Sequence, residues 1–502
     1  MNDYNTILGR IDHFAATTPN KAAIVFGDKT LTYADLACAS VQMAHVLQNK
    51  GIGAGDRVCL LATNCPEYLV LYHAVMRCGA ALFPINSDLA ASEIAYILGH
   101  AEPALVVSDT ANTAKILGAQ AQAAFKVPHA ELEALAASAV ESSTERAGLH
   151  QRKPSDMALV IYTSGTTSAP KGVPATDAIE INGADTFASI WAVSAQDRCL
   201  CALPLSFLFG LHTATLVAFS QGATVVLFPK FNPVRVLEGI VQNRITMVLG
   251  VPTMYAMMLE HVTQTGVEYD LSSVRMAGSS GAPLAVVTRD AIEAKLGMRI
   301  QDYYALSECR PIFSFRAADA QPVPVGAVGK AVPNVEVCLL DEEGSPVATG
   351  STGSILVRSS ETLMPGYFRD PERTALAFKE GWFVTGDLAY QDIEGNYYIA
   401  GRTRDQVISG GQKISAIEVE NVLLQHPAVA QAAAVGVPDA KFGELLKAVL
   451  VLRPGAVLDP DKLLEHCKDK LAAYKLPRLF SVRDELPVSP AGKVLKRELI
   501  DE

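Results

Sequence analysis

The sequence has no excess of basic residues and no N-terminal targeting pattern. Its 42 lysines and arginines stand against 53 aspartates and glutamates, for a net charge of −11. This balance argues against nucleic acid as a partner, because a phosphate backbone is bound through positive charge. Residues 1–4 contain no basic region leading into an apolar core, so we expect no secretory signal.

The nine cysteines show no repeated close spacing along the 502 residues. An odd number of scattered cysteines is typical of reduced thiols and not of a disulfide framework. Together with the missing signal, this pattern predicts a cytoplasmic protein.

The segment from Cys199 to Pro229 lacks Asp, Glu, Lys and Arg altogether. A window over it scores near a transmembrane helix, but Pro204, Gly210 and the Gln221-Gly222 turn divide it into pieces too short to cross a bilayer. We therefore expect no membrane span. The segment is expected to form a strand, a buried helix and a second strand over residues 223–228, which makes it a candidate pocket wall.

The length predicts more than one domain, because a single core stops growing at roughly 250–300 residues. Strand-like and helical patterns alternate along the first part of the chain, which indicates layered α/β structure with parallel strands. From about 320 to 400, short strands with Gly and Pro turns predict a small β-rich subdomain. Residues 401–405 form a polar joint. The expected fold is a large N-terminal α/β domain, residues 1–400, followed by a small α+β domain, residues 401–502.

A hydroxyl- and glycine-rich loop is the most informative feature that is present. Residues 162–173 read Tyr-Thr-Ser-Gly-Thr-Thr-Ser-Ala-Pro-Lys-Gly-Val, after an apolar run, 157–162, that predicts a buried strand. Such a loop presents N–H groups and hydroxyls to phosphate oxygens, and Lys171 adds a point charge. A Walker A loop needs Gly-Lys-Ser/Thr opening a helix, and Pro170 before Lys171 argues against it. The alternative, a flexible surface connection, is disfavoured by the strand-like flanks.

The sequence of this loop resembles the signature motif of the adenylate-forming superfamily. This superfamily includes acyl-CoA synthetases and other AMP-dependent ligases, peptide-synthetase adenylation domains and luciferases. The resemblance covers about residues 160–500, and residues 30–36 extend it toward the N-terminus. Further motifs follow in the family's order: residues 278–284 (Gly-Ser-Ser-Gly-Ala-Pro-Leu), 304–308 (Tyr-Ala-Leu-Ser-Glu), 366–367 (Gly-Tyr), 381–387 (Gly-Trp-Phe-Val-Thr-Gly-Asp), 401–402 (Gly-Arg), 409–411 (Ser-Gly-Gly) and 490–493 (Pro-Ala-Gly-Lys).

The resemblance implies a two-step reaction with ATP, CoA and Mg²⁺ as cofactors. A carboxylate attacks the α-phosphorus of MgATP to give an acyl-adenylate and pyrophosphate, and a thiol then displaces AMP. The site must therefore neutralise negative charge on the triphosphate and on the transition state. The resemblance also implies that the small C-terminal domain is mobile and rotates between the two steps.

By this resemblance, Ser307 contacts the α-phosphate, Lys171 contributes to the phosphate loop, and Glu308 ligates Mg²⁺. A lone carboxylate plus phosphates is how Mg²⁺ is usually held. Lys493 is implied as the mobile lysine that bridges the carboxylate and the α-phosphate during adenylation. The loop residues expected to hold the β- and γ-phosphates are Thr163, Ser164, Gly165, Thr166 and Thr167.

The nucleoside is implied to lie among the later motifs. Asp387 has two carboxylate oxygens suited to the two ribose hydroxyls, and Arg402 is the expected second contact. Adenine is expected between Tyr304 and the turn Gly281, Ala282 and Pro283. Its exocyclic amine is expected near Asp302 or Tyr303.

Residues of the joint and of the C-terminal domain are implied in the second step. Ser409, Gly410 and Gly411 would form part of the tunnel for the pantetheine arm of CoA, where missing side chains allow close approach. Arg404 occupies the hinge position, at which relatives carry Asp or Lys. Taken singly, Lys493 could be an ordinary tail lysine and Gly-Gly a simple turn.

The residues of the implied acyl pocket differ from those that are frequent in the family. Phe207 replaces a frequent histidine, and Arg310 stands two residues after Glu308 in an otherwise aromatic and apolar stretch. Beside a low-dielectric pocket, Arg310 would favour an acid with a second anionic group, a dicarboxylate or a sulfo-acid. The alternative is that Arg310 pairs with Glu308 or turns to solvent, which favours an aromatic or medium-chain acid. His212 and Ser280 complete the expected pocket.

Asp177, where many relatives carry histidine, is expected to begin a helix together with Glu180. No pocket role is assigned to either residue.

The sequence thus predicts an ATP-dependent, AMP-forming acid–CoA ligase that acts on a small carboxylic acid as a monomer or homodimer. A peptide-synthetase domain would need an acidic residue in the pocket segment 199–229, which has none. A luciferase stays open, as does a carrier-protein thiol in place of CoA. A non-catalytic nucleotide-binding relative would be expected to have lost Lys493, Glu308 or Asp387, and all three are present.

Overall fold

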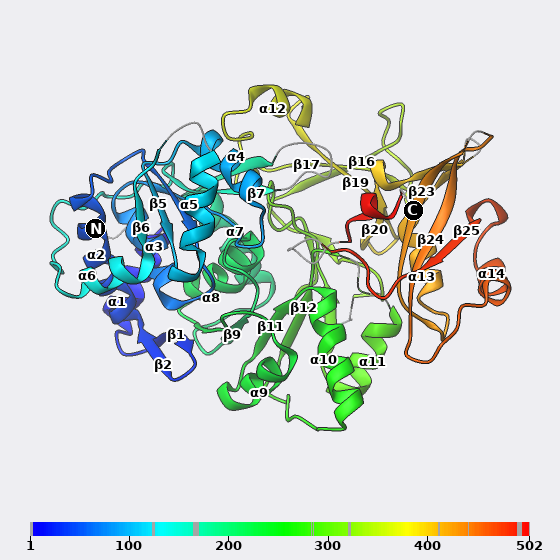
Figure 1. The fold of residues 1–502 in the computed structure, drawn as a ribbon, viewed down its shortest axis with the longest axis horizontal. Coiled ribbons are helices and arrows are strands. Elements are labelled where there is room, and N and C mark those ends of the chain that lie inside the picture. The colour runs from blue at the N-terminus through cyan, green and yellow to red at the C-terminus, as the bar shows by residue number, and fades with distance from the viewer. Residues whose placement is uncertain are drawn as a thin grey trace.

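The computed structural model describes residues 4–122, 126–163, 170–282, 284, 286–319, 323–409, 412–439, 441–488 and 494–500. Within these ranges the strands form five sheets. Figure 1 shows the blue-to-green part of the chain on one side of the molecule and the orange-to-red C-terminal part on the other. A large N-terminal α/β domain is followed by a smaller C-terminal domain, as the sequence predicts.

A six-stranded sheet carries the strand that leads into the Ser/Thr-rich loop. In spatial order it consists of β6 (His129–Glu131), β5 (Leu105–Ser108), β3 (Arg57–Leu61), β4 (Ala81–Pro84), β7 (Met157–Thr163) and β8 (Lys171–Thr176). The strands are parallel up to β7, and β8 runs antiparallel to it. Strands β4 and β5 are buried along their whole length, which is typical of parallel strands covered on both faces.

The loop between β7 and β8 closes a hairpin. Thr163 lies opposite Lys171 in the antiparallel ladder, and residues 164–169 lie outside the described residues. The strand that follows the loop distinguishes it from a Walker A loop, which opens a helix. Helix α7 (Asp177–Ile190) begins after β8, at the predicted residue. Its N-cap is Thr176, whose hydroxyl accepts a hydrogen bond from the N–H of Ile179 at 3.3 Å.

A seven-stranded sheet brings several motifs to one edge. In spatial order it consists of β13 (Ile300–Asp302), β12 (Met276–Ser279), β11 (Met247–Gly250), β9 (Arg198–Cys201), β10 (Thr224–Leu227), β1 (Ala22–Phe26) and β2 (Lys29–Thr32). Gly250 and Asp302 both pair with Ser279 at the carboxyl ends of parallel strands. The segments that follow β12 and β13 therefore leave the sheet side by side, at the edge where open α/β sheets bind ligands.

Helices separate and cover the two sheets. One core combines apolar residues from both sheets with α1 (Ile7–Thr17), α2 (Tyr33–Asn49), α3 (Pro66–Arg77), α6 (Leu132–Val140), α7 and α8 (Val217–Ser220). The outer face of the six-stranded sheet packs on α4 (Ala91–Ala101) and α5 (Thr113–Gln122). The outer face of the seven-stranded sheet packs on α9 (Pro233–Asn243), α10 (Pro252–Thr265) and α11 (Val286–Leu296). The result is the layered α/β arrangement that the alternating pattern predicts.

The segment without charged residues lies in this core. It forms β9, a π-helical stretch (Phe209–Leu216), α8 and β10, and most of its side chains are buried. The expected order of strand, buried helix and strand is confirmed. No helix in the described ranges is long and apolar enough to cross a membrane.

A β-rich part follows the layered sheets. Its five strands are β16 (Glu336–Leu340), β17 (Gly353–Arg358), β19 (Trp382–Gln391), β18 (Phe378–Lys379) and β20 (Tyr397–Arg402), all antiparallel. Helix α12 (Pro371–Ala377) precedes β18, and β14 (Phe313–Ser314) pairs with β15 (Lys330–Ala331) nearby in sequence. Asp387 on β19 lies opposite Arg402 on β20. The register of this hairpin thus places two predicted ribose contacts side by side.

The C-terminal part has a sheet and a core of its own. The sheet consists of β22 (Gln412–Ile414), β21 (Val407–Ser409), β24 (Gly443–Leu452), β23 (Val429–Asp439) and β25 (Leu479–Val482), with helices α13 (Ala416–Leu423) and α14 (Pro460–Lys468). Among the described residues, its buried apolar side chains come from positions 407–499. The boundary at residue 401 remains a prediction. The hydroxyl of Ser415 donates to the carbonyl of Ala400 across it, at 2.5 Å.

All nine cysteines carry free thiols, and six of them are buried. This confirms the expectation of reduced thiols, because the two members of a disulfide would have to lie within bonding distance.

Candidate active site

Lys171, which directly follows the phosphate loop, is connected to Glu308 through Tyr367. The Lys171 ammonium lies over the ring of Tyr367, 4.8 Å from its centroid. The Tyr367 hydroxyl donates to Oε1 of Glu308 at 3.1 Å, and the N–H of Met364 donates to the Glu308 carbonyl at 2.8 Å. Tyr367 therefore links the predicted phosphate-binding lysine to the predicted metal ligand.

The sequence predicts no role for Tyr367, although Gly366-Tyr367 is one of the ordered motifs. Burial raises the pKa of the Tyr367 hydroxyl above its usual range, and the neighbouring Glu308 raises it further. The hydroxyl therefore stays protonated and serves as a donor, which holds one oxygen of the Glu308 carboxylate in place.

A second cluster gathers Tyr304, Asp387 and Arg402. The Tyr304 hydroxyl donates to Oδ2 of Asp387 at 2.5 Å, and Nε of Arg402 lies 3.1 Å from Oδ1. Asp387 is only 5 % exposed. The ring of Tyr304 stacks on Phe313, with centroids 5.5 Å apart. The two predicted ribose contacts and the predicted adenine-stacking residue thus lie together.

Tyr303 has a different environment from its neighbour. Its ring is buried against Phe187, Trp191 and Phe209, with centroids at 5.6, 5.1 and 5.9 Å. This placement leaves the main chain as the part of Tyr303 that could contact a base.

The turn expected to cover the adenine directly follows β12. Ser280 donates its N–H to the Gly250 carbonyl at 3.3 Å, and Gly281 has φ +89°, a conformation that glycine adopts without strain. Ala282 follows it. Asp302, at the end of the adjacent strand β13, is buried and pairs with Arg289 of α11. The turn and Asp302 therefore flank the same edge of the sheet.

The predicted acyl pocket contains a buried charge cluster. Arg310 is 2 % exposed and donates through Nη2 to Oε1 of Glu180, and through Nη1 to the carbonyl of Ser307 at 2.5 Å. Nδ1 of His212 lies 2.9 Å from the other Glu180 oxygen. Neither of the expected partners of Arg310, Glu308 or solvent, is the observed one. This corrects the alternative stated from the sequence.

The electrostatics of this cluster follow from burial and pairing. Burial would raise the pKa of Glu180, but Arg310 and His212 outweigh it and lower the pKa to about 2. Burial lowers the pKa of His212, although Glu180 opposes the shift. Glu180 is therefore ionised and His212 neutral near pH 7, so that the Glu180 charge offsets that of Arg310.

Two nitrogen atoms of the cluster have no hydrogen-bond partner within the described part of the chain, Nε of Arg310 and Nε2 of His212. Gly183 on α7 lies against both residues. A Cβ there would stand 2.9 Å from the Arg310 carbonyl and 3.2 Å from Nε2 of His212. The glycine therefore permits the close approach of helix α7 to the cluster. Phe207 precedes the π-helical stretch and is half-buried, as is Ser280.

Several predicted site residues lie outside the described residues: Ser164, Gly165, Thr166, Thr167, Pro283, Gly410, Gly411 and Lys493. Ser409 ends β21 and pairs with Gln412 and Gly443. Arg404 lies in the short 3₁₀ helix Thr403–Asp405, between β20 and β21. Their assignments to the CoA tunnel and the hinge remain predictions.

Family comparisons agree with this arrangement. A family described as "AMP-binding enzyme" matches residues 11–368, and a second, "AMP-binding enzyme C-terminal domain", matches residues 418–493. Together the two matches cover most of the chain, including the hairpin of the phosphate loop and the cluster of Arg310, Glu180 and His212, while Asp387 and Arg402 lie between them.

Individual proteins extend the likeness over nearly the whole chain. An indoleacetate–CoA ligase of Aromatoleum aromaticum is 34 % identical, over 97 % of this chain and 96 % of that protein. A sulfoacetate–CoA ligase of Cupriavidus necator is 30 % identical, over 99 % and 98 %. ATP-bound MatB from Rhodopseudomonas palustris superimposes with a TM-score of 0.91 at 31 % identity, over 99 % and 98 %. The chain therefore belongs to the AMP-binding enzyme family and is an AMP-forming acid–CoA ligase.

Proposed function

We propose that this ligase activates a small monocarboxylic acid that lacks a second anionic group, with MgATP and then CoA. The observation that carries this proposal is the pairing of Arg310 with Glu180. The arginine is the unexpected cation of the predicted pocket, and its charge is already offset by a buried carboxylate. A second anion placed beside it would meet a cluster of near-zero net charge, which offers little attraction for the desolvation that it costs.

The binding of the nucleotide is inferred from two other groups of residues, one around Asp387 and one around Glu308. Asp387, held by Tyr304 and Arg402, presents carboxylate oxygens to the ribose hydroxyls. Lys171 supplies positive charge at the end of the phosphate loop, and the N–H of Met364 fixes the main chain of Glu308. These groups orient the triphosphate so that the carboxylate of the acid meets the α-phosphorus.

Mg²⁺ fits the residues present. Among the described residues no group of three His, Cys, Asp or Glu side chains is placed to hold a metal. Glu308 offers one carboxylate, which suits an ion that takes phosphates and waters as its remaining ligands. When bound, the ion would neutralise charge on the triphosphate and on the leaving pyrophosphate.

At the acid end, the neighbourhood of the cluster is aromatic. Tyr303 and Phe209 contact one another beside helix α7, and Phe187 and Trp191 complete the group. The indoleacetate–CoA ligase among the relatives acts on an aromatic acid. An aromatic or other uncharged acyl group is therefore favoured.

A second candidate is a dianionic acid, and a specific observation supports it. Nε of Arg310 lacks a partner among the described residues, and one relative is a sulfoacetate–CoA ligase. Under this alternative, the substrate would approach Arg310 through Nε while Glu180 keeps the other side of the guanidinium.

Pyrophosphate release separates the two candidates. Purified protein is assayed with MgATP and CoA against matched pairs of acids that differ by one anionic group, such as phenylacetate with a carboxyphenylacetate and propionate with succinate. We expect kcat/KM to be higher for the singly charged member of each pair. Turnover confined to the doubly charged members would overturn the monocarboxylate proposal, and silence with every acid would contradict the ligase activity itself.

Asp387→Asn tests the ribose assignment. We expect kcat/KM for ATP to fall about 20-fold, because a charge-assisted hydrogen bond to a ribose hydroxyl is weakened. The preference of the wild type for ATP over 2′-deoxy-ATP should shrink in the variant. Glu394→Gln is the matched control, since Glu394 is exposed in the turn of the same β19–β20 hairpin. An unchanged ratio of ATP to 2′-deoxy-ATP in Asp387→Asn would remove the ribose role.

A further inference from the structure

Ser307 and Glu308, the predicted contacts of the α-phosphate and of Mg²⁺, lie in the irregular segment between β13 and β14. Isolated bridges involve Tyr304 and Cys309, on either side of the two residues. Neither Ser307 nor Glu308 belongs to a helix or strand, so no continuous ladder of main-chain hydrogen bonds sets their position. Their geometry therefore depends on contacts with neighbouring side chains and loops.

Two donors hold the carbonyl groups of this segment. The N–H of Met364 donates to the Glu308 carbonyl at 2.8 Å. The Arg310 side chain folds back and donates through Nη1 to the Ser307 carbonyl at 2.5 Å. A hydrogen bond from a charged guanidinium belongs to the stronger class, and Arg310 is almost completely buried, so water does not compete for it.

Helix α7 holds the other side of the guanidinium. Nη2 of Arg310 donates to Oε1 of Glu180, and Nδ1 of His212 lies 2.9 Å from Oε2 of the same carboxylate. All three residues are at most 2 % exposed. A guanidinium presents its donors in a rigid planar fork, so the single Arg310 side chain links the helix to the Ser307 carbonyl in a fixed geometry.

The same helix continues from the hairpin of the phosphate loop. Strand β8 begins at Lys171 and ends where α7 begins. Glu180 lies in the first turn of this helix. The pair of Arg310 and Glu180 therefore joins the strand that carries the phosphate-loop lysine to the segment that carries the predicted metal ligand.

We infer that Arg310 is a positioning residue, which bridges Glu180 and the Ser307 carbonyl and so fixes the segment of Ser307 and Glu308 relative to the phosphate-loop hairpin. The inference rests on the proposed activation of an acid with MgATP, and it requires no contact between Arg310 and the acid. Glu308 would supply one ligand to an ion whose other ligands are phosphates and waters. Loss of the bridge should therefore weaken the part of ATP binding that depends on the metal.

The test measures how much Mg²⁺ contributes to ATP binding. Calorimetry without acid or CoA gives the Kd for ATP in EDTA and the Kd for ATP with saturating Mg²⁺, and the first divided by the second is the metal ratio. Arg310→Gln should lower this ratio about ten-fold, because loss of a group that orients a metal ligand weakens metal binding by that order. The Mg²⁺ concentration for half-maximal pyrophosphate release should rise by a similar factor.

Two further variants separate positioning from stability. Arg310→Lys keeps a positive charge beside Glu180 but lacks the planar fork, so it should keep most of the stability and still lower the metal ratio at least about three-fold. The double variant Glu180→Gln, Arg310→Gln removes both buried charges. It should recover more than half of the stability lost in Glu180→Gln and still show the low metal ratio of Arg310→Gln.

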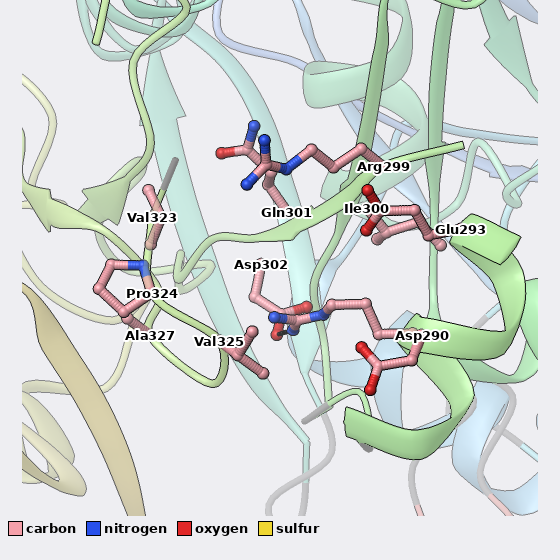
Figure 2. Close-up of a pocket in the computed structure, with 11 residues that line it drawn as sticks. Asp290, Glu293, Arg299, Ile300, Gln301, Asp302, Val323, Pro324, Val325 and Ala327 are labelled. Atoms are coloured by element: carbon pink, nitrogen blue, oxygen red, sulfur yellow. Dashed lines mark hydrogen bonds and ion pairs between the residues drawn. The ribbon is translucent and has the colours of Figure 1, made fainter. Parts of the chain in front are cut away.

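A second buried arginine pair, beside the predicted adenine turn, provides a comparison. Arg289 pairs with Asp302 at the end of β13, next to a cavity of about 50 Å³ that is lined by α11, β13 and residues 323–327. Figure 2 shows the Asp302 carboxylate between Val325 and helix α11. Arg289→Gln should change both Kd values by the same factor, because the predicted adenine turn contributes no ligand to the metal.

Arg77→Gln is the matched control for the loss of a buried pair. Nη2 of Arg77, on α3, lies 2.7 Å from Asp12, on α1. This variant should lose stability and keep the wild-type metal ratio. A wild-type metal ratio in both Arg310→Lys and the double variant would overturn the inference. Binding of MgATP without turnover of any acid would contradict the proposed ligase activity instead, and the metal ratio would still decide the role of Arg310.

Discussion

Replacing Lys493 by alanine is expected to slow acyl-adenylate formation by about 100-fold or more, while transfer of the acyl group from a supplied acyl-adenylate to CoA stays within about three-fold of the wild-type rate. The first step brings an anionic carboxylate against an anionic phosphate, and a bridging ammonium offsets both charges in the transition state. The second step starts from a neutral acyl carbon and does not need that bridge. Adenylation is measured by pyrophosphate release, and thioester formation by loss of free thiol.

Arg497→Ala is the control for this change, because Arg497 is an exposed cation four residues further along the same tail. It should keep both half-reactions at the wild-type rate. If Lys493→Ala lowers the rates of both half-reactions equally, the assigned role is contradicted, since a merely structural lysine would affect both. The assignment of Lys493 comes from the family resemblance, and this split between half-reactions is therefore its decisive test.

Local structure could be predicted where one signal dominates the segment. The strand expected over residues 157–162 is β7, Met157–Thr163, because a short apolar run bounded by turn residues has few alternatives. One of the helical patterns in the first part of the chain forms α3, Pro66–Arg77, and the proline at its first position fixes the start. Ordered motifs likewise identified Asp387 and Arg402, which the β19–β20 hairpin brings into register.

The different environments of two adjacent residues, Tyr303 and Tyr304, were harder to predict. Tyr303 and Tyr304 were both expected at the nucleotide, but consecutive side chains of a strand point to opposite faces. The ring of Tyr303 accordingly enters the aromatic core, while the hydroxyl of Tyr304 reaches Asp387. The alternation of side chains along extended chain predicts that Tyr303 and Tyr304 point to opposite faces. It does not predict which of the two side chains faces inward.

The partner of Arg310 could not be read from the sequence. Glu180 lies 130 residues away, and the sequence suggested only that it lies near the start of a helix. Their contact depends on how α7 packs between the two sheets and on the absence of a side chain at Gly183. No local pattern encodes that packing, so the sequence left the neighbour of Arg310 open.

The same cluster gives the largest expected effect on stability. Glu180→Gln should lower the free energy of unfolding of the large domain by about 3 kcal/mol, because Arg310 would remain buried without a counter-charge. Loss of the Glu180 charge should also disturb the predicted active site, since Arg310 donates a hydrogen bond to the carbonyl of Ser307, beside Glu308. Urea unfolding followed by tryptophan fluorescence measures it directly. The chain has two tryptophans, and Trp191 lies at the end of α7, the helix that carries Glu180.

Glu336→Gln is the matched control for the stability change. It removes the same carboxylate from an arginine pair, but Glu336 and Arg358 are both exposed, and such pairs contribute little. Its unfolding midpoint should stay at the wild-type value. The double variant Glu180→Gln, Arg310→Gln should recover more than half of the loss, because the uncompensated charge is then removed as well. A Glu180→Gln protein as stable as the wild type would show that the pair does not carry this part of the fold.

The pH dependence supplies an independent check on the same pair. The pKa of Glu180 is lowered from its ordinary value of 4.5 to about 2 in the folded protein, against burial, by Arg310 and His212. A carboxylate with a depressed pKa stabilises the fold fully above its unfolded value and loses that contribution as the pH falls toward the folded value. The difference in unfolding free energy between wild type and Glu180→Gln should therefore be constant near neutral pH and narrow as the pH falls from 4.5 toward about 2. A difference that stays constant through this range would mean that the lost stability comes from packing and not from the charge of Glu180.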